Sequence, residues 1–224
     1  SCGEDYADKD VVKDSPIDPV TNLEATPYVG AVILNWDLPE NDQYYYSMVS
    51  YVDNNGQKVD RKVSKFSVDS ENPNRIRAVI PGFTDTNEYE FSVTAYNYAG
   101  SASETVSVKA TPEDKSKAKD YIVKTVKFTP GVESAKITWE NELDADLTLV
   151  VKHFDYYNPG KPTTELVDEY DASTPKTEII ENLPIEENIV MTYFMRDNET
   201  GDESETLTQE FEVEVPVEHI YDPA

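Results

Sequence analysis

The stretch FTDTNEYEFSVTAYNYAG, residues 83–100, contains the pattern that decides the fold. From residue 89 onward, polar and apolar side chains alternate, and the apolar set on one face is Tyr89, Phe91, Val93 and Ala95. A period of two with one apolar face is typical of a strand that is buried on one side. We therefore predict a β-strand over residues 88–97.

Similar short strands are expected on both sides of this stretch, at residues 22–25, 32–36, 44–52, 59–68, 75–80 and 105–110. Between two of them lies Asn55-Gly56, a pair that favours a tight hairpin turn. About seven short strands in 100 residues indicate an antiparallel β-sandwich.

The pattern occurs twice. Trp36 and Trp139 lie 103 positions apart in similar strand sequences, and Gly100 and Gly201 lie 101 positions apart. Landmarks at one offset indicate a tandem repeat. The second copy predicts strands at residues 121–128, 135–139, 147–154, 176–180, 188–195 and 206–215, and no amphipathic helix.

The first copy resembles a fibronectin type III domain. Phe83 precedes Tyr89 by six residues, which is the spacing of that family's corner tyrosine, and residues 95–100 match the end of its sixth strand. The resemblance implies that Trp36 lies in the core and that the Tyr89 hydroxyl returns to nearby backbone. In the second copy Ile189 stands where the tyrosine would be.

The expected fold is therefore all-β, with two tandem antiparallel β-sandwiches of the fibronectin type III or immunoglobulin-like type. The expected boundaries are a flexible N-terminal tether at 1–16, a first domain at 17–113, a short linker at 114–118, a second domain at 119–216 and a C-terminal tail at 217–224.

Charge narrows the range of partners. The 224 residues include 45 acidic and 19 basic side chains, which gives a formal net charge of -26. Nucleic acid is not expected as a partner, because phosphate binding depends on Lys and Arg. Residues 119–216 hold 23 acidic and 8 basic residues, against 14 and 7 in residues 17–113. The second domain could meet a basic partner or cations, or simply be a solvated acidic surface.

The single cysteine, Cys2, lies in the sequence SCGEDYADKD at residues 1–10. Bacterial lipoproteins carry acyl chains on such a cysteine, and Glu4 and Asp5 resemble the surface-export signal of Bacteroidetes-type lipoproteins. The chain is similar to the accessory lipoproteins of glycan-uptake systems. This resemblance implies lipidation at Cys2, attachment to the membrane and a location at the cell surface, on the outer membrane. The alternative is an incidental free thiol.

Catalytic groups are scarce. The two histidines, His153 and His219, have no evident nucleophile, and there is no phosphate-binding glycine loop or zinc spacing. We expect no enzyme activity, no cofactor and no metal site. Acidic loops, such as the one that carries Glu140, Glu142, Asp144 and Asp146, leave calcium binding open, although the EF-hand spacing is absent.

Tyrosines are the best candidates for ligand binding. Tyr96 and Tyr98 are expected on the outer face of the strand at 88–97, and some tyrosines of the strand at 44–52 should share that face. We predict a glycan site at Tyr96, Tyr98, Tyr44 and Tyr46, since exposed tyrosines stack on sugars and form hydrogen bonds with them. The alternative is ordinary cross-strand packing of tyrosines.

The leading hypothesis is a non-enzymatic cell-surface lipoprotein that captures a polysaccharide or adheres to a surface by aromatic stacking. The alternative is a spacer or scaffold. It would present a partner, such as another outer-membrane protein, or a C-terminal carbohydrate-binding domain that is not part of this chain.

Overall fold

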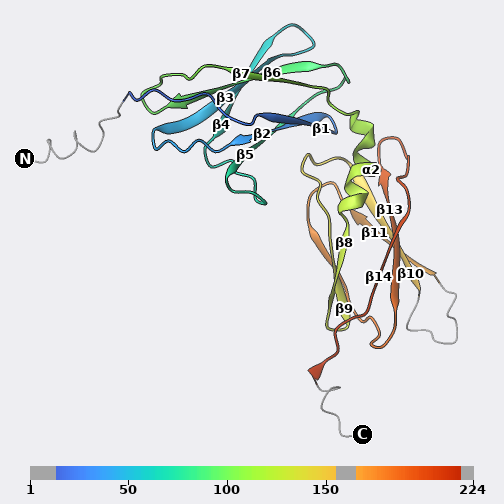
Figure 1. The fold of residues 1–224 in the computed structure, drawn as a ribbon. Helices are drawn as coiled ribbons and strands as arrows, with labels where there is room; N and C mark the ends of the chain where they lie inside the picture. The colour runs from blue at the N-terminus through green and yellow to red at the C-terminus, as the bar shows by residue number, and fades with distance from the viewer. Residues whose placement is uncertain (1–13, 155–164, 218–224) are drawn as a thin grey trace, which may run out of the picture. The chain divides into compact units, whose positions relative to one another are not determined.

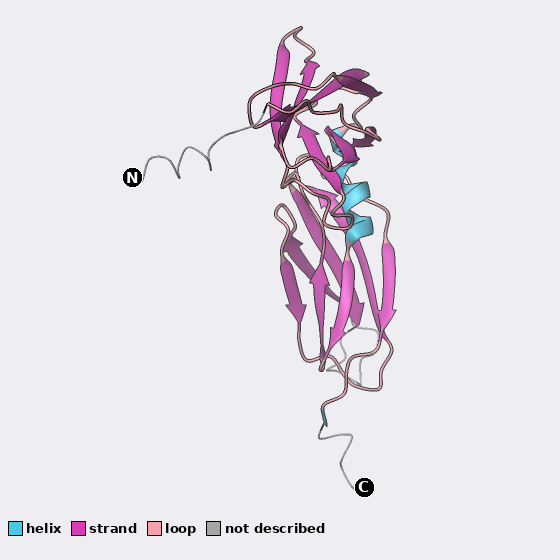
Figure 2. Cartoon of the chain, turned by 60° about the vertical axis from the view of Figure 1, so that its left-hand side comes forward, coloured by secondary structure: helices cyan, strands magenta, loops and turns pink. Residues whose placement is uncertain are grey.

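The computed structural model describes residues 14–154 and 165–217, which fold mainly as β-strands (Figure 2). The chain forms two compact units, Ser1–Lys115 and Ser116–Ala224. Each unit contains a three-stranded and a four-stranded sheet, and every strand pair in these sheets is antiparallel. The predicted all-β fold with two tandem antiparallel β-sandwiches is therefore confirmed.

The first unit contains all seven predicted strands (Figure 1). Its three-stranded sheet has the order β1-β2-β5, with β1 (Glu24–Tyr28), β2 (Ala31–Asp37) and β5 (Arg75–Pro81). Its four-stranded sheet has the order β4-β3-β6-β7, with β3 (Tyr44–Val52), β4 (Lys58–Ser64), β6 (Tyr89–Asn97) and β7 (Val106–Ala110). The β3–β4 hairpin turns at Gly56, whose φ of 78° suits glycine.

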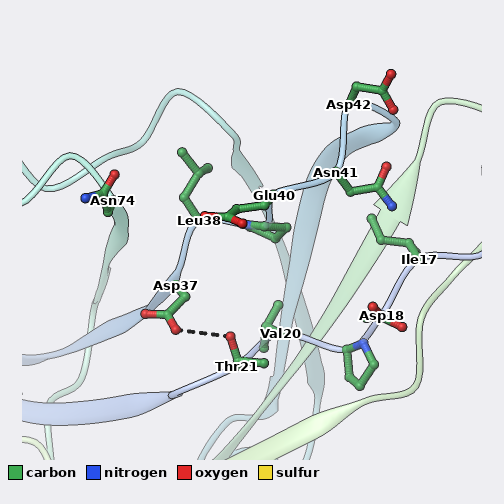
Figure 3. A pocket seen from close by; sticks show the side chains of 12 residues that line it. Ile17, Asp18, Val20, Thr21, Asp37, Leu38, Glu40, Asn41, Asp42 and Asn74 are labelled. Carbon is green, nitrogen blue, oxygen red and sulfur yellow. Dashed lines mark hydrogen bonds between the residues drawn. The ribbon is translucent and has the colours of Figure 1, made fainter.

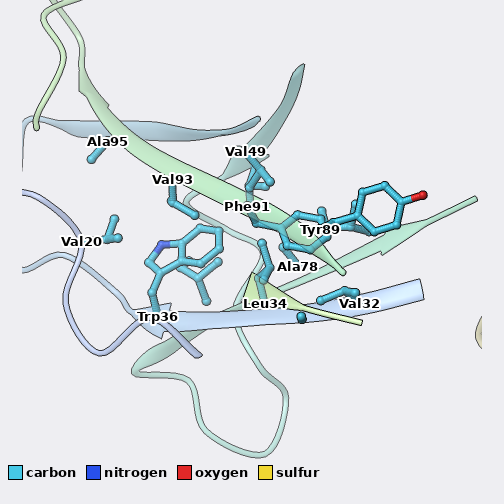
Figure 4. Packing of buried hydrophobic residues seen from close by; sticks show 14 of the residues in the cluster. Val20, Val32, Leu34, Trp36, Val49, Ala78, Tyr89, Phe91, Val93 and Ala95 are labelled. Carbon is cyan, nitrogen blue, oxygen red and sulfur yellow. The ribbon is translucent and has the colours of Figure 1, made fainter. Parts of the chain in front are cut away.

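The core of this unit lies between the two sheets (Figure 4). Trp36 comes from β2 and is fully buried, as are Phe91, Val93 and Ala95 of β6. Ile17 and Val20 join the same cluster from the segment before β1. The alternation in residues 89–95 thus places its apolar side chains in the core, as the sequence predicts.

The corner tyrosine has a different partner from the one expected. The Tyr89 hydroxyl donates to the carboxylate of Asp85, at 2.8 Å from Oδ2 and 2.9 Å from Oδ1, and not to backbone. Asp85 lies in the loop just before β6, and it also accepts a hydrogen bond from the Asn87 backbone N–H at 3.1 Å. A side-chain carboxylate therefore joins the ring of Tyr89 to the corner loop.

The second unit repeats the strand order of the first. Its three-stranded sheet, in the order β12-β9-β8, contains β8 (Lys127–Gly131), β9 (Ser134–Thr138) and β12 (Thr177–Ile180). Its four-stranded sheet, in the order β11-β10-β13-β14, contains β10 (Leu147–Phe154), β11 (Glu165–Asp171), β13 (Ile189–Asp197) and β14 (Leu207–Phe211). Ile189, at the position of the corner tyrosine, is fully buried.

The start of this unit differs from the prediction. A strand was expected over residues 121–128 and a linker over 114–118. Instead, helical turns η1 (Lys115–Lys117), α2 (Ala118–Ile122) and η2 (Val123–Thr125) occupy most of this segment. Ala118 and Ile122 lie one helical turn apart, and both are buried. The segment therefore buries its apolar side chains with helical spacing.

No helix among the described residues is long and apolar enough to cross a membrane.

Replacing Tyr89 with Phe should lower the free energy of unfolding by about 1 kcal/mol at pH 7, the net value of one hydrogen bond. Burial, together with the neighbouring Asp85, raises the pKa of Tyr89 to about 12 from an ordinary value of 10.0. Because the folded-state pKa is the higher one, this contribution is complete below pH 10 and is lost as the pH rises through about 12.

Urea denaturation of both proteins at pH 7 and at alkaline pH measures this difference. Tyr45→Phe is the control, since the Tyr45 hydroxyl has no hydrogen-bond partner among the described residues. Equal stability of the wild type and Y89F at pH 7 would contradict the assigned bond.

Candidate functional site

The outer face of the four-stranded sheet in the first unit carries the predicted tyrosines. In the β3–β6 register, Tyr46 lies opposite Tyr96, and Met48 lies opposite Thr94. Residues directly opposite each other in an antiparallel pair share a face. Val49 and Val93, also paired, point to the core and are fully buried. Tyr46 and Tyr96 therefore point away from the core.

A β-bulge near the start of β3 decides which of its tyrosines reach this face. Tyr44 pairs with Asn97 and Tyr46 pairs with Tyr96, so Tyr45 is an extra residue with no opposite partner. Such an insertion breaks the strict alternation of side chains. Tyr45 is consequently 49% exposed, whereas Tyr44 is only 2% exposed.

The prediction that Tyr44 belongs to an exposed site is therefore wrong. Its hydroxyl lies 2.7 Å from Ser47 Oγ inside the core, and burial raises the pKa of the phenol. Asn97, its opposite residue, is also fully buried and donates to the Ser15 carbonyl oxygen at 2.8 Å. On the outer face, Tyr45 lies where the sequence predicts Tyr44.

We call Tyr45, Tyr46, Tyr96 and Tyr98 the tyrosine cluster. Tyr46 and Tyr96 are stacked, with ring centroids 5.0 Å apart and an interplanar angle of 8°. Tyr45 and Tyr98 are stacked at 4.6 Å and 25°, and Tyr45 meets Tyr46 edge-on at 5.3 Å. The structure thus brings together the predicted Tyr46, Tyr96 and Tyr98 with a residue that the prediction missed.

Two lysines flank the tyrosine cluster. Lys62 Nζ lies 5.0 Å from the centroid of the Tyr46 ring. Lys65 Nζ lies 4.9 Å from the centroid of the Tyr98 ring and donates a hydrogen bond to the Tyr98 hydroxyl. Lys65 also lies 5.3 Å from the ring of Phe66, which is 81% exposed. Both ammonium groups are therefore in cation–π range of a ring in the cluster.

These contacts determine which parts of the rings remain open. Strands β4 and β6 lie on opposite sides of β3, so Lys62 and Tyr96 approach Tyr46 from opposite sides. A sugar could not lie flat on Tyr46 without displacing one of them. The hydroxyls of Tyr45, Tyr46 and Tyr96 have no hydrogen-bond partner among the described residues. Ring edges, hydroxyls and ammonium groups are thus the parts of the cluster that remain open.

A second feature of this unit is a hollow of about 990 Å³ between residues 17–21 and the loop after β2 (Figure 3). Asp37, at its edge, accepts hydrogen bonds from Asn22 at 2.6 Å, Arg75 at 2.9 Å and Thr21 at 3.1 Å. Those of Asn22 and Arg75 are the main reason why the pKa of Asp37 is lowered. These hydrogen bonds connect the segment before β1 to β2 and β5. The Asp37 carboxylate therefore already accepts three hydrogen bonds from the protein itself.

The acidic loops do not converge in the part of the chain that the structure describes. In residues 14–154 and 165–217, no group of three or more His, Cys, Asp or Glu side chains is placed to hold a metal ion. His153 is 9% exposed, with Nε2 at 3.0 Å from Asp168 Oδ2 and Nδ1 at 3.0 Å from the Phe154 carbonyl oxygen. Both of its ring nitrogens already face oxygen atoms.

The predicted lipidation residue, Cys2, lies outside the described residues, and so does His219. The last residues of the predicted tether are described, and they contact the domain. Asp14 accepts hydrogen bonds from Ser101 Oγ at 2.6 Å and Asn97 Nδ2 at 3.2 Å, and these bonds lower the pKa of Asp14. Residues 14 and 15 are therefore attached to the end of β6.

Comparison with known proteins gives one family model and several solved structures. The model matches residues 17–112, and its description is "Domain of unknown function (DUF4959)". It covers the described strands of the first unit only. No curated protein matches the chain.

The solved structures that are similar include fibronectin type III domains. A two-domain fibronectin type III segment of chicken tenascin is 17% identical, with 87% of this chain and 99% of that chain covered and a TM-score of 0.34. The FN1–FN3 domains of chicken CNTN1 are 11% identical, with 89% and 65% covered and a TM-score of 0.35.

A third similar structure is the spore cortex lytic enzyme SleM of Clostridium perfringens. It is 17% identical, with 43% of this chain but only 28% of the enzyme covered and a TM-score of 0.34. Because all three TM-scores are below 0.5, the assignment of the fold rests on the strand order and register described above.

The bulge makes a testable prediction about β3. Tyr44→Ala should lower the free energy of unfolding by about 3 to 5 kcal/mol, as expected when a large buried ring is removed. Tyr45→Ala, one residue along, should cost no more than about 1 kcal/mol, because it removes only a surface ring pair. Urea denaturation of the two variants measures both values. A larger loss from Tyr45→Ala than from Tyr44→Ala would contradict the bulge.

Proposed function

We propose that this chain is a non-enzymatic cell-surface binding protein that captures a polysaccharide, or adheres to a polysaccharide-bearing surface, through the tyrosine cluster. The fibronectin-like sandwich fold is consistent with an adhesion or scaffold role. The observation that carries the proposal is the set of three tyrosine hydroxyls without partners among the described residues, on a sheet face where Tyr45 and Tyr98 are 49% and 38% exposed.

The chemistry of the tyrosine cluster suits a sugar. Tyrosine combines an apolar ring with a hydroxyl that donates and accepts hydrogen bonds, and sugars present C–H and O–H groups side by side. The outer surfaces of Tyr45 and Tyr98 offer apolar contact, and the hydroxyls of Tyr46 and Tyr96 offer hydrogen bonds nearby. An open sheet face, unlike a closed pocket, accepts a chain that extends beyond the site at both ends.

Surface attachment would strengthen such binding. Each contact on an open face is modest, but many anchored copies that meet one polymer increase the overall affinity. Lipidation at Cys2, on the outer membrane, is the anchor that we propose. It is supported by the sequence Cys2-Gly3-Glu4-Asp5 and by its resemblance to Bacteroidetes-type lipoproteins. Acyl chains together at one cysteine hold a protein stably on a membrane.

A spacer or scaffold is the second candidate, and one observation favours it. Tyr46 is covered by Tyr96 on one side and by Lys62 on the other, which is also what cross-strand stabilisation of a sheet requires. In this role the two sandwiches would hold a partner, such as another outer-membrane protein, away from the membrane.

Substituting the two most exposed rings of the tyrosine cluster tests the capture function. The Tyr45→Ser/Tyr98→Ser double variant should bind at least about tenfold more weakly to whichever polysaccharide the wild type binds, since stacked rings are worth about 1 kcal/mol or more each. The measurement is binding to an immobilised panel of polysaccharides, with thermal melting to check folding. Tyr121→Ser is the matched control, because Tyr121 is also 38% exposed but belongs to the second unit. Failure of the wild type to bind any polysaccharide would favour the spacer.

Lipidation is tested separately. Intact mass spectrometry of protein purified from the native membrane should show the mass of acyl chains on the peptide that contains Cys2. A Cys2→Ser variant should move to the soluble fraction. An unmodified Cys2 in the native protein would overturn the anchor, but would leave the binding face untouched.

A further inference from the structure

Basic residues are concentrated beside the tyrosine cluster. Residues 17–113 contain seven Lys and Arg residues, and four of them lie within residues 58–65: Lys58, Arg61, Lys62 and Lys65. This segment forms β4 and the residue after it, next to β3 in the sheet. In a chain with 45 acidic and 19 basic residues, this is a local reversal of charge.

The two lysines at the rings are not neutralised by nearby carboxylates. Lys62 and Lys65 have no ion pair among the described residues. Lys58 differs, because it lies 3.7 Å from Asp60, and Asp60 also accepts a hydrogen bond from Ser50. Arg61 lies opposite Val49, which points to the core, so on the outer face of β4 and just beyond it the positive charge without an ion pair is that of Lys62 and Lys65.

The rows of side chains that cross the sheet at this end are free of acid. Lys62 lies opposite Met48, which lies opposite Thr94. Ser64 lies opposite Tyr46, which lies opposite Tyr96. On β6 the nearest outward-facing acid is Glu90, which is paired with Lys109 near the other end of the strand. On β4 the nearest outward-facing acid is Asp60, two residues from Lys62, and it accepts a hydrogen bond from Ser50. The rows of Lys62 and of Ser64 therefore have no carboxylate directly opposite in β3 or β6.

Protection of the sheet edge does not account for both lysines. Lysines on an edge strand discourage pairing with another sheet, and Lys62 on β4 fits this role. Lys65 lies beyond Ser64, the last residue of β4, and its ammonium group is bound to the Tyr98 hydroxyl, just past the end of β6. Its position serves the tyrosine cluster rather than the edge.

We propose that the ligand of the tyrosine cluster is an acidic saccharide, one that carries carboxylate or sulfate groups. This inference rests on the proposed capture function and names its ligand class. An ammonium group over a ring keeps outward N–H donors, since the Lys side chain has three, and Lys65 uses one on Tyr98. Hydrogen bonds between these donors and an anionic group are stronger than neutral ones.

The net charge makes this selectivity unusual for the chain. A chain of charge -26 repels polyanions over most of its surface, so an acidic glycan would gain affinity only where the field is locally positive. With a Debye length of about 8 Å at physiological salt, an anionic group at the cluster feels mainly the charges beside it, and the ammonium groups of Lys62 and Lys65 lie 5.0 and 4.9 Å from ring centroids there. A neutral glycan would gain hydrogen bonds from these ammonium groups but not the added attraction between opposite charges.

Matched polysaccharides test the inference. The probes are dextran, carboxymethyl dextran and dextran sulfate, which share a backbone, together with polygalacturonate and its methyl ester. The wild type should prefer the acidic member of at least one set. The Lys62→Met/Lys65→Met variant should lose about ten- to hundredfold in affinity for that member, the value of one charge-assisted hydrogen bond, and less than about tenfold for the neutral one. The acidic interaction should also weaken with added NaCl.

A second variant with the same change in net charge is the control. Lys58→Met/Lys109→Met alters the same sheet away from the tyrosine cluster, and it should keep the preference for the acidic probe. An equal loss in both variants would overturn the assignment to Lys62 and Lys65. Equal binding of neutral and acidic probes by the wild type would overturn the inference while the capture function stands.

Two other results would also decide against the inference. Absence of binding to every probe and every polysaccharide of the panel would overturn both the inference and the capture function. The second result combines no saccharide binding with self-association of the wild type in sedimentation. If the Lys62→Met/Lys65→Met variant loses that self-association, the occupant is the acidic surface of a second copy of the chain.

Discussion

The packing of the β6 inner face against Trp36 is the constraint on which the first unit depends. Side chains of a strand alternate strictly, so burial of Phe91 and Val93 forces Ser92 and Thr94 outward. Because β3 and β7 pair with β6 on either side, the same choice of face extends across the sheet. The outer surface of this sandwich is therefore specified by its core, and a shift of register by one residue would bury the tyrosines.

A departure from this rule in β3 creates the candidate site. At the β3 bulge Tyr44 remains in the core, while Tyr45 and Tyr46 both reach the outer face. Two adjacent residues cannot share a face in regular pleating, so the bulge increases the number of rings that meet there. The result is two stacked pairs, Tyr46–Tyr96 and Tyr45–Tyr98, joined edge-on at Tyr45 and Tyr46.

Lys62 and Lys65 add positive charge to this aromatic surface. Rings stacked on each other have fewer open faces for a sugar, and Lys62 covers Tyr46 further. What remains is rich in hydrogen-bond donors, from phenols and ammonium groups. Within an acidic chain, the ligand that we propose for this surface would be distinguished by its charge as well as by its shape. The two units share a strand order, yet in the second unit Ile189 replaces the corner tyrosine and helical turns replace the first part of the expected strand.

The sequence by itself determined the all-β class, the two copies and the outward position of Tyr96, because period-two alternation and turn residues are local signals. The core role of Trp36 came from the resemblance to fibronectin type III domains. Only the tertiary structure decided that Tyr45, and not Tyr44, lies on the outer face and that Asp85 accepts the hydrogen bond of the Tyr89 hydroxyl. It also decided that residues 118–122 are helical. A bulge depends on the partner strand, and a short helix on the core that it covers. The proximity of Lys62 and Lys65 to the rings likewise required the β3–β4 register, although their basic segment is visible in the sequence.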